Sequence, residues 1–598
     1  KYGYRGALYG HFGQGCVHSR ISFDLRSAEG IRRYRAFLDE ASDLVVSYGG
    51  SLSGEHGDGQ QRAEFLHKQY GPELVEAMRE FKRIWDPRGK MNPGKVISPY
   101  RVDQHLKLGV EYNPPRPMVK FAYRQDGGDF AHATLRCVGV GKCRQPEGVD
   151  VMCPSYIVTH EEKHTTRGRA RLLFEMLQGE VIRDGWQSKE VYEALDLCLA
   201  CKGCTSDCPV HVDMPTYKAE FLYHHFKGLR RRRSRHMYAF GFVDQAARAA
   251  SLLPGLANLL TQTPLLSGVA KRLAGMDSQR RIPMFAPLTL QQWFRRHTKP
   301  ESNTMRPRVL LWPDTFNNHF HTDVGVAGVE ALEAAGYEVV MPRAHVCCGR
   351  PLYDYGFLDM AERYLRRTLR QLRSEIRRGT PVVGMEPSCI AVFKHELREM
   401  LPHDADAARL AKNCYHWSEF FEKFDIPTPT LARKAVVWGH CHQKATGGTG
   451  ADMTLLNTRM GLAAREAKGG CCGLAGSWGF ESGKYEMSKA CGEVGFFPAA
   501  RSADRQTLLI ADGFSCKTQL EQSEVGRKAL HVAQVMKLAR DGTVFAEFPE
   551  RAAPPPPAAP AGMRLVRAAA VCILGALLVG ITTKTALSVS RAKGRQWS

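Results

Sequence analysis

Four cysteines and a proline form the segment of this chain with the clearest chemistry: Cys198, Cys201, Cys204, Cys208 and Pro209. Three thiolates at this close spacing can hold one iron–sulfur cube, and the fourth, placed before proline, ligates the neighbouring cluster in two-cluster ferredoxins. Zinc sites more often use two Cys-x2-Cys pairs separated by a longer loop, which fits this segment poorly. The spacing therefore predicts an iron–sulfur cluster and a protein that transfers electrons.

A second, incomplete cysteine set precedes this segment. It consists of Cys137, Cys143 and Cys153, with Pro154 after the last and Val140 at the place of the second cysteine. Cross-ligation between the two motifs predicts one complete ligand set, Cys198, Cys201, Cys204 and Cys153. The remaining set, Cys137, Cys143 and Cys208, is one thiolate short. A three-iron cluster and a four-iron cluster completed by another ligand both fit it, so we expect one or two 4Fe–4S clusters.

Two glycine-rich histidine segments lie near the start of the chain. The first contains His11 and His18, and the second contains Gly54, Glu55 and His56. Two imidazoles and a carboxylate form a plausible ligand set for a divalent metal. His56 is a candidate general base, and glycines allow the backbone to approach a ligand closely.

These segments, together with the Asp-Pro-x-Gly-Lys-Met-Asn-Pro-Gly-Lys run at 86–95, resemble the carboxyl-terminal cap domain of FAD-linked oxidases. That family includes glycolate oxidase, D-lactate dehydrogenase and D-2-hydroxyglutarate dehydrogenase. The resemblance implies that a divalent metal, Zn or Mn, clamps a 2-hydroxy acid, that His56 takes the hydroxyl proton, and that the flavin is nearby. The implied metal ligands are His11, His18 and Glu55, and the implied cofactor contacts are Asn92, Gly54 and His56.

The same resemblance implies FAD shared with a preceding domain, so we expect this chain to be the carboxyl-terminal part of a longer polypeptide. Gln14 and Cys16 stand where many family members carry Asp and Asn, which leaves the metal and the fine specificity open. Arg20 is either a further contact for the substrate carboxylate or an ordinary surface arginine.

The last third of the folded chain repeats one scheme, with short apolar runs alternating with helical patterns and cysteines at matching places. The repeated cysteines are Cys347, Cys348 and Cys389 in the first half, and Cys441, Cys471, Cys472 and Cys516 in the second. The halves resemble the cysteine-rich domain of heterodisulfide reductase subunits and of the glycolate oxidase iron–sulfur subunit, which makes these seven residues metal-ligand candidates. Asp314 stands where a leading cysteine is often found. An ordinary cluster, zinc and a redox-active thiol pair therefore all stay open.

The sequence patterns around these residues predict a multidomain fold of mixed α+β and α/β type. The expected segments are a cap domain at 1–102, a linker at 103–130, a helical two-cluster ferredoxin-like domain at 131–225, a helical connector at 226–304, cysteine-rich α/β halves at 305–430 and 431–548, a Pro/Ala linker at 549–563 and a hydrophobic basic tail at 564–598.

The net charge and the cysteine content indicate which partners and which cell compartment to expect. The net charge of +22 favours anionic partners, but no basic motif interleaved with aromatic residues indicates nucleic acid. Clusters of reactive thiols favour a reducing compartment, so we expect a cytoplasmic protein. The arginine run at 230–235 is either a solvated turn or a contact with an anionic membrane, and the tail is either a membrane anchor or an amphipathic tail. The expected location is the inner face of the cell membrane.

The order of cap, clusters and cysteine-rich halves resembles large fused FAD-linked oxidase/iron–sulfur proteins. It implies an enzyme that oxidises a small D-2-hydroxy acid and passes electrons through 4Fe–4S clusters to a quinone or a protein carrier. Two alternatives remain: an electron-transfer module without hydroxy-acid activity, and a heterodisulfide or thiol reductase-like subunit.

Overall fold

A computed structural model describes residues 1–106, 108–145, 152–228, 232–299, 306–543 and 547–568. The chain forms two compact units, Lys1–Pro115 and Arg116 onward. The first unit contains the expected cap segment. The second contains the expected cluster domain, the connector and both cysteine-rich halves.

The first unit combines a β-hairpin with two long helices. Strands β1 (Gly6–His11) and β2 (Cys16–Ile21) pair antiparallel, and Gly15 adopts a left-handed conformation in the turn. Helix α1 (Ala28–Ser47) begins where the Ser27 hydroxyl accepts the Gly30 N–H at 2.9 Å, and α2 (Leu66–Trp85) breaks its regular geometry at Gly71, before Pro72. Few side chains are fully buried here, the main apolar cluster being Ala63, Leu66 and Val75.

Short helices surround the predicted cluster ligands in the second unit. They are α3 (Phe130–Thr134), α4 (Pro154–Thr159), α5 (Thr166–Gln178), α6 (Lys189–Asp196), α7 (Gly203–Asp207) and α8 (Met214–His225). The Thr165 side chain caps α5 by accepting the Gly168 N–H at 2.8 Å. Helix α4 begins directly after Cys153, and α7 carries Cys204 in its first turn. One cysteine of each motif is therefore positioned at the start of a helix.

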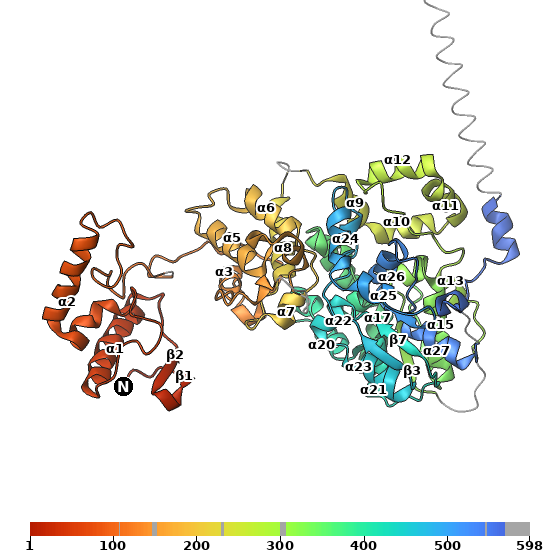
Figure 1. Ribbon diagram of the computed structural model, residues 1–598. Helices are drawn as coiled ribbons and strands as arrows, with labels where there is room; N and C mark the ends of the chain where they lie inside the picture. Colours follow the sequence, from red (N-terminus) through yellow and green to blue (C-terminus); the bar gives the residue numbers. More distant parts are fainter. Residues whose placement is uncertain (107, 146–151, 229–231, 300–305, 544–546, 569–598) are drawn as a thin grey trace, which may run out of the picture. The chain divides into compact units, whose positions relative to one another are not determined.

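The segment between the cluster ligands and the first parallel sheet is mainly helical. It contains α9 (Arg235–Gly241), α10 (Val243–Ala250), α11 (Pro254–Gln262), α12 (Pro264–Ala274) and α13 (Leu290–Phe294). Helices α11 and α12 lie at the outer edge of the second unit, beyond α10 (Figure 1).

Two parallel sheets form the cysteine-rich region, which confirms the predicted α/β halves. The first has the order β4-β3-β5-β6, and the second has the order β8-β7-β9. Their bounds are β3 (Arg308–Trp312), β4 (Glu338–Val340), β5 (Val382–Gly384), β6 (Cys414–His416), β7 (Lys434–Val437), β8 (Ala463–Glu466) and β9 (Leu508–Ile510). Among the covering helices, α15 (Thr322–Ala334) packs against α27 (Val532–Arg540) and joins the two halves in one core.

Residues 561–568 are helical at the end of the described chain. Within the described ranges, no helix combines the length and apolar character needed to cross a bilayer. The predicted membrane anchor falls mostly at 569–598, outside the described residues, and so does Arg230–Arg231 of the basic run.

Candidate functional site

The first unit gathers its predicted metal ligands around one carboxylate. Glu55 is ion-paired with His18, lies 3.4 Å from His11 Nε2 and lies 3.2 Å from His56 Nε2. The hydrogen bond from His18, followed by the charges of the other imidazoles, lowers the pKa of Glu55. The arrangement offers nitrogen and carboxylate oxygen donors in a solvent-accessible site, which suits a divalent cation.

Strand pairing explains how His18 reaches this position. Tyr9 of β1 lies opposite His18 of β2, and their rings stack with centroids 4.9 Å apart. Arg20 follows two residues later on the same face of β2, because side chains alternate along a strand. Its guanidinium donates to the Tyr9 hydroxyl at 3.3 Å. Arg20 therefore lies beside the histidine cluster rather than at a distant point of the surface.

Cys16 belongs to the same cluster, although from sequence it stood out only as a departure from the family pattern. Ligand atoms of Cys16, His18 and Glu55 lie within 4.8 Å of one another. A Cβ at Gly54 would come within 2.7 Å of the Cys16 Sγ, so glycine permits this close approach. Asn92 lies in a separate loop and has a left-handed backbone, with φ of 46°.

Four thiols predicted to form the complete cluster set surround one buried cavity in the second unit. They are Cys153, Cys198, Cys201 and Cys204, and Thr166, Arg169 and Lys202 also line the cavity. Burial raises the pKa of Cys153 to about 12 and raises that of Cys204 as well. The Thr166 N–H donates to the Cys153 Sγ at 3.1 Å. Buried, closely grouped thiols supplied with an N–H donor are the environment that a thiolate-ligated cluster requires.

The three-thiol set lies in the same core but is more exposed. Cys137 and Cys208 are half-buried, whereas Cys143 is buried. The Arg167 N–H lies 3.4 Å from the Cys143 Sγ, and its guanidinium donates to the Gly139 carbonyl. Arg136, next to Cys137, donates to the Val210 carbonyl two residues after Cys208, which ties the two segments together.

The second cysteine-rich half brings four thiols into direct contact. Cys441 contacts Cys471, Cys471 contacts Cys472, and Cys472 contacts Cys516. The hydrogen bond from Cys471 lowers the pKa of Cys441 to about 7, and thiol donors on both sides lower that of Cys472. These residues come from the start of α22 (Cys441–Thr446), the Cys-Cys-Gly loop and α26 (Phe514–Glu521).

The first half reproduces this arrangement with one replacement. Cys348 Sγ lies 3.1 Å from Cys389 Sγ, and the Thr315 hydroxyl lies 3.5 Å from Cys347 Sγ. Thr315 begins α14 (Thr315–His319) as Cys441 begins α22, and Asp314 caps the first helix as His440 caps the second. The counterpart of Cys441 is therefore Thr315 rather than Asp314, which corrects the sequence alignment of the halves.

The cluster loop is held directly against the cysteine-rich region. Arg350 donates to the Ala200 carbonyl at 3.1 Å and to Glu396 at 2.7 Å, while Lys202 lies 3.1 Å from the same Glu396. His442 Nε2 lies 2.9 Å from the Ala200 carbonyl. Cys201 and Cys441 occur in one apolar cluster. The sequence does not reveal this network, because no local pattern marks it.

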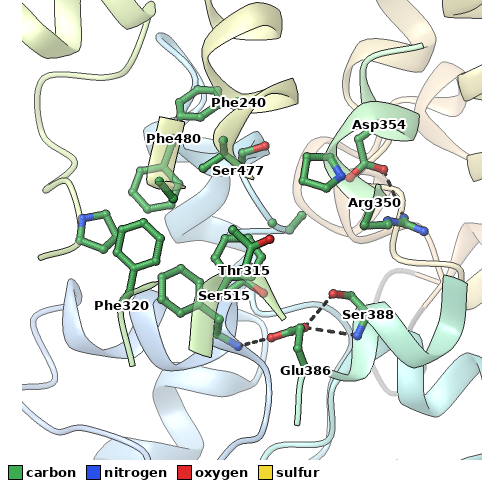
Figure 2. A pocket seen from close by; sticks show the side chains of 18 of the residues that line it. Phe240, Thr315, Phe320, Arg350, Asp354, Glu386, Ser388, Ser477, Phe480 and Ser515 are labelled. Carbon is green, nitrogen blue, oxygen red and sulfur yellow. Dashed lines mark hydrogen bonds and ion pairs between the residues drawn. The ribbon is translucent and has the colours of Figure 1, made fainter. Parts of the chain in front are cut away.

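A cavity of about 360 Å³ extends from the paired thiols to the connector helices. Figure 2 shows Phe240, Phe320 and Phe480 along one side of it and Arg350, Glu386 and Ser388 along the other. Glu386 accepts hydrogen bonds from Ser388 and from the Phe514 N–H, so its buried carboxylate is fixed at the boundary between the halves. The walls are mainly apolar, as in pockets that bind organic ligands.

Three family matches cover the regions that carry these sites. Residues 1–96 match "FAD linked oxidases, C-terminal domain", residues 133–212 match "4Fe-4S dicluster domain", and residues 315–394 match "Cysteine-rich domain". The chain therefore contains an FAD-linked oxidase carboxyl-terminal domain, a 4Fe–4S dicluster domain and a cysteine-rich domain. These matches confirm the three predicted resemblances.

Curated relatives resemble the chain over long stretches. D-2-hydroxyglutarate dehydrogenase of Pantoea ananatis is 27% identical over 88% of this chain and 55% of its own length. One component of the anaerobic glycerol-3-phosphate dehydrogenase of Escherichia coli is 28% identical over 42% of the chain and 63% of its own length. Lactate utilization protein A of Bacillus licheniformis is 29% identical over 38% of the chain and 98% of its own length. The chain spans about half the length of the D-2-hydroxyglutarate dehydrogenases that it matches.

Proposed function

We propose that this chain is the substrate-cap and electron-transfer part of an FAD-dependent D-2-hydroxy-acid dehydrogenase. The observation that carries the proposal is the presence, in one chain, of the Glu55–histidine cluster and the cavity lined by four thiols. The Glu55–histidine cluster is suited to hold a hydroxy acid, and the four-thiol cavity is suited to hold an electron-transfer group. The substrate is a D-2-hydroxy acid of the D-lactate, glycolate or D-2-hydroxyglutarate type.

In the cap, His11, His18 and Glu55 would hold a divalent metal, Zn or Mn, which would bind the hydroxy acid. His56, 3.2 Å from Glu55, takes the hydroxyl proton. Arg20 adds positive charge beside this cluster and contacts the substrate carboxylate. Bound FAD supplies the hydride acceptor at the substrate carbon.

FAD would be shared between this unit and a further domain, and Asn92, Gly54 and His56 would be its contacts in this unit. The exposed apolar surface of the first unit supports this proposal, since such surfaces mark interaction sites. Its large exposed side chains include Leu44, Val45 and Tyr48 of α1 and its end, and Leu74, Phe81, Ile84 and Trp85 of α2.

Two iron–sulfur sites follow in the second unit. Cys153, Cys198, Cys201 and Cys204 would ligate one cluster, and Cys137, Cys143 and Cys208 would ligate either a 4Fe–4S cluster completed by another ligand or a 3Fe–4S cluster. A bound cluster supplies one-electron transfer, which divides the two-electron oxidation into single steps. The Arg350–Ala200 contact then fixes the first ligand loop against the cysteine-rich halves.

The cysteine-rich halves form the exit side of the electron path. Cys441, Cys471, Cys472 and Cys516 form a four-thiol metal site, and Cys347, Cys348 and Cys389 form a three-thiol site. The adjacent apolar cavity accommodates a quinone-type acceptor, with a protein carrier as the alternative acceptor. The protein acts in the cytoplasm at the inner face of the cell membrane.

A reductase is the second candidate, favoured by the six thiols that line one cavity: Cys347, Cys348, Cys389, Cys441, Cys471 and Cys472. A disulfide substrate would then accept electrons at Cys347, Cys348 or their counterparts. The two functions differ in the direction of electron flow, because a disulfide would oxidise reduced protein whereas a hydroxy acid would reduce oxidised protein.

Turnover of a panel of D- and L-2-hydroxy acids by the native protein that contains this chain tests the proposal. The assay is run without oxygen, with a soluble dye as electron acceptor. Turnover with one D-acid and none with its L-enantiomer is the expected result. Oxidation of the dithionite-reduced protein by disulfides, with no hydroxy acid active, would favour the reductase.

A further inference from the structure

The α11–α12 hairpin presents large aliphatic side chains to solvent. Leu265 is 86% exposed and Leu273 is 66% exposed, which is unusual for leucine in a folded domain. The exposed members of this surface, called the hairpin face below, are Leu252, Leu259, Leu260, Leu265, Leu266, Val269 and Leu273. Clustered exposed apolar groups of this size mark an interaction surface.

Both helices point large apolar side chains toward solvent, whereas helices on the surface of a protein normally bury such side chains. In α12, Leu265, Val269 and Leu273 recur every fourth residue and point outward. Its inward residues are small: Ser267 is buried, and Ala270 and Ala274 line the 360 Å³ cavity. An amphipathic helix packed on a protein core normally buries its large apolar residues, so this face is built for an apolar partner outside the protein.

Helix α11 also points leucines toward solvent, and here a polar residue faces the protein. The Asn258 side chain faces the protein, donating to the Phe285 carbonyl at 2.9 Å and accepting the Phe285 N–H at 2.8 Å. Its neighbours Leu259 and Leu260 are exposed. Two hydrogen bonds thus fix the orientation that turns the leucines outward.

The hairpin itself carries only positive charges, and the first acidic residue after it is Asp277. Residues 251–275 contain no Asp or Glu, whereas Lys271 and Arg272 lie on the hairpin. Arg248 and Arg281, at the two ends of this segment, are exposed. Basic residues beside an exposed apolar face match an anionic lipid surface, which offers negative headgroups above apolar chains.

The carboxyl-terminal segment approaches the same face. The Arg567 guanidinium donates to the Pro287 carbonyl at 2.6 Å and to the Ser251 carbonyl at 3.2 Å, at the start of the hairpin segment. Its neighbours Leu565 and Val566 are exposed. The uncharged sequence 568–583 begins directly after this anchoring point. The described end of the chain, at Arg567, therefore lies beside the start of the hairpin segment.

We propose that the hairpin face docks on an anionic lipid surface. Helices of 9 and 11 residues are too short to cross a bilayer, so α11 and α12 lie in the headgroup region with their leucines toward the acyl chains. Because α12 also forms one wall of the cavity, docking brings the cavity close to lipid-soluble molecules. This inference rests on the membrane association proposed above and names the surface responsible for it.

Flotation with lipid vesicles tests the inference without any substrate. The chain is mixed with vesicles of phosphatidylcholine alone or with added phosphatidylglycerol, both as the full chain and as a variant that ends at Ala568. We expect both forms to bind the anionic vesicles and the double variant Leu265→Glu, Val269→Glu of each form to bind at least tenfold more weakly. Val181→Glu, at an exposed valine outside the hairpin, is the matched control and leaves binding unchanged.

Three results would overturn the inference. The variant ending at Ala568 could fail to bind, which would assign docking to residues 569–598 alone. The double variant could bind as well as the parent, or the parent could form a dimer and ignore vesicles. Unchanged iron content and thermal midpoint of the double variant show that it is folded, and its unchanged reduction by dithionite separates lipid docking from the redox function.

Discussion

The Arg350 guanidinium donates a 3.1 Å hydrogen bond to the Ala200 carbonyl, across 150 positions of sequence. Ala200 lies between two of the predicted cluster ligands, and Arg350 follows the first Cys-Cys-Gly sequence directly. Glu396 balances the charge of Arg350 at 2.7 Å and that of Lys202 at 3.1 Å. A single buried ion network therefore joins the cluster loop to the cysteine-rich region.

Replacing Arg350 with Ala should destabilise the second unit by about 3 kcal/mol, because it leaves part of the buried Glu396 charge uncompensated. Thermal unfolding measures the effect. Arg366→Ala is the control, since Arg366 is an exposed helical residue paired with Glu362 and should change the stability by less than about 1 kcal/mol. Equal effects of the two changes would contradict the importance of the network.

Replacing Cys204 with Ala should remove one cluster, because the remaining three thiols cannot complete the set. Iron analysis should show a loss of about four atoms per chain, accompanied by loss of visible absorbance. Cys414→Ala is the matched control: this thiol is also buried, and its pKa is raised by burial to about 12, but it lies at β6 outside the cluster cavity. Unchanged iron in the Cys204 variant would reject the ligand assignment.

Glu55→Gln should weaken the proposed divalent metal site of the first unit while leaving the iron content unchanged. The loss of one anionic ligand should lower bound Zn or Mn and reduce kcat/KM for the hydroxy acid by at least about 100-fold. Metal analysis and steady-state kinetics measure the two effects, and added metal should partly restore activity. His67→Gln, a change at an exposed histidine of α2, serves as the control. Full metal content and activity in the Glu55 variant would exclude the proposed clamp.

Acid should destabilise the second unit partly through His531. Burial lowers the pKa of His531 from 6.5 to about 3, and its ring bonds both the Met385 carbonyl and the Ala533 N–H. Below pH 6.5 the unfolded chain binds a proton that the folded chain excludes. The contribution of the neutral ring is thus fully present above pH 6.5 and declines toward pH 3, by about 1.4 kcal/mol per pH unit.

The thermal midpoint of wild type and of His531→Gln, measured from pH 7.5 to pH 5, checks this effect. The variant should be less stable at pH 7.5, because it loses the cap of α27, but its stability should fall less steeply with acid. His160→Gln, at an exposed histidine, should keep the wild-type slope. Parallel slopes for all three proteins would refute the role of His531.

Sequence alone predicted the features that depend on local spacing. The four cysteines of the cluster motif are close neighbours in the sequence, so they must lie close together in any fold. The parallel strands of the cysteine-rich halves were also predictable, because apolar runs such as Val309–Trp312 alternate with helical patterns. The cross-motif grouping of Cys153 with Cys198 was predictable only through the ferredoxin spacing rule.

Other relationships depend on tertiary contacts and carry no local signal. Thr315 replaces a thiol, but a threonine at a helix start looks ordinary in sequence. The hairpin face was also missed, because periodicity identifies the apolar side of a helix without saying whether that side faces the protein. In the structure Asp314 and His440 cap corresponding helices, and this equivalence aligns Thr315 with Cys441.

Low-temperature EPR of the oxygen-free native protein tests the central claim most directly. We predict that one D-2-hydroxy acid, added without dithionite, produces the signals of reduced clusters, and that its L-enantiomer does not. The His56→Ala variant should respond at least about 100-fold more slowly, while dithionite produces the same signals in both proteins. Clusters that dithionite reduces but that no hydroxy acid reduces would contradict the proposed route from the cap to the cysteine ligands.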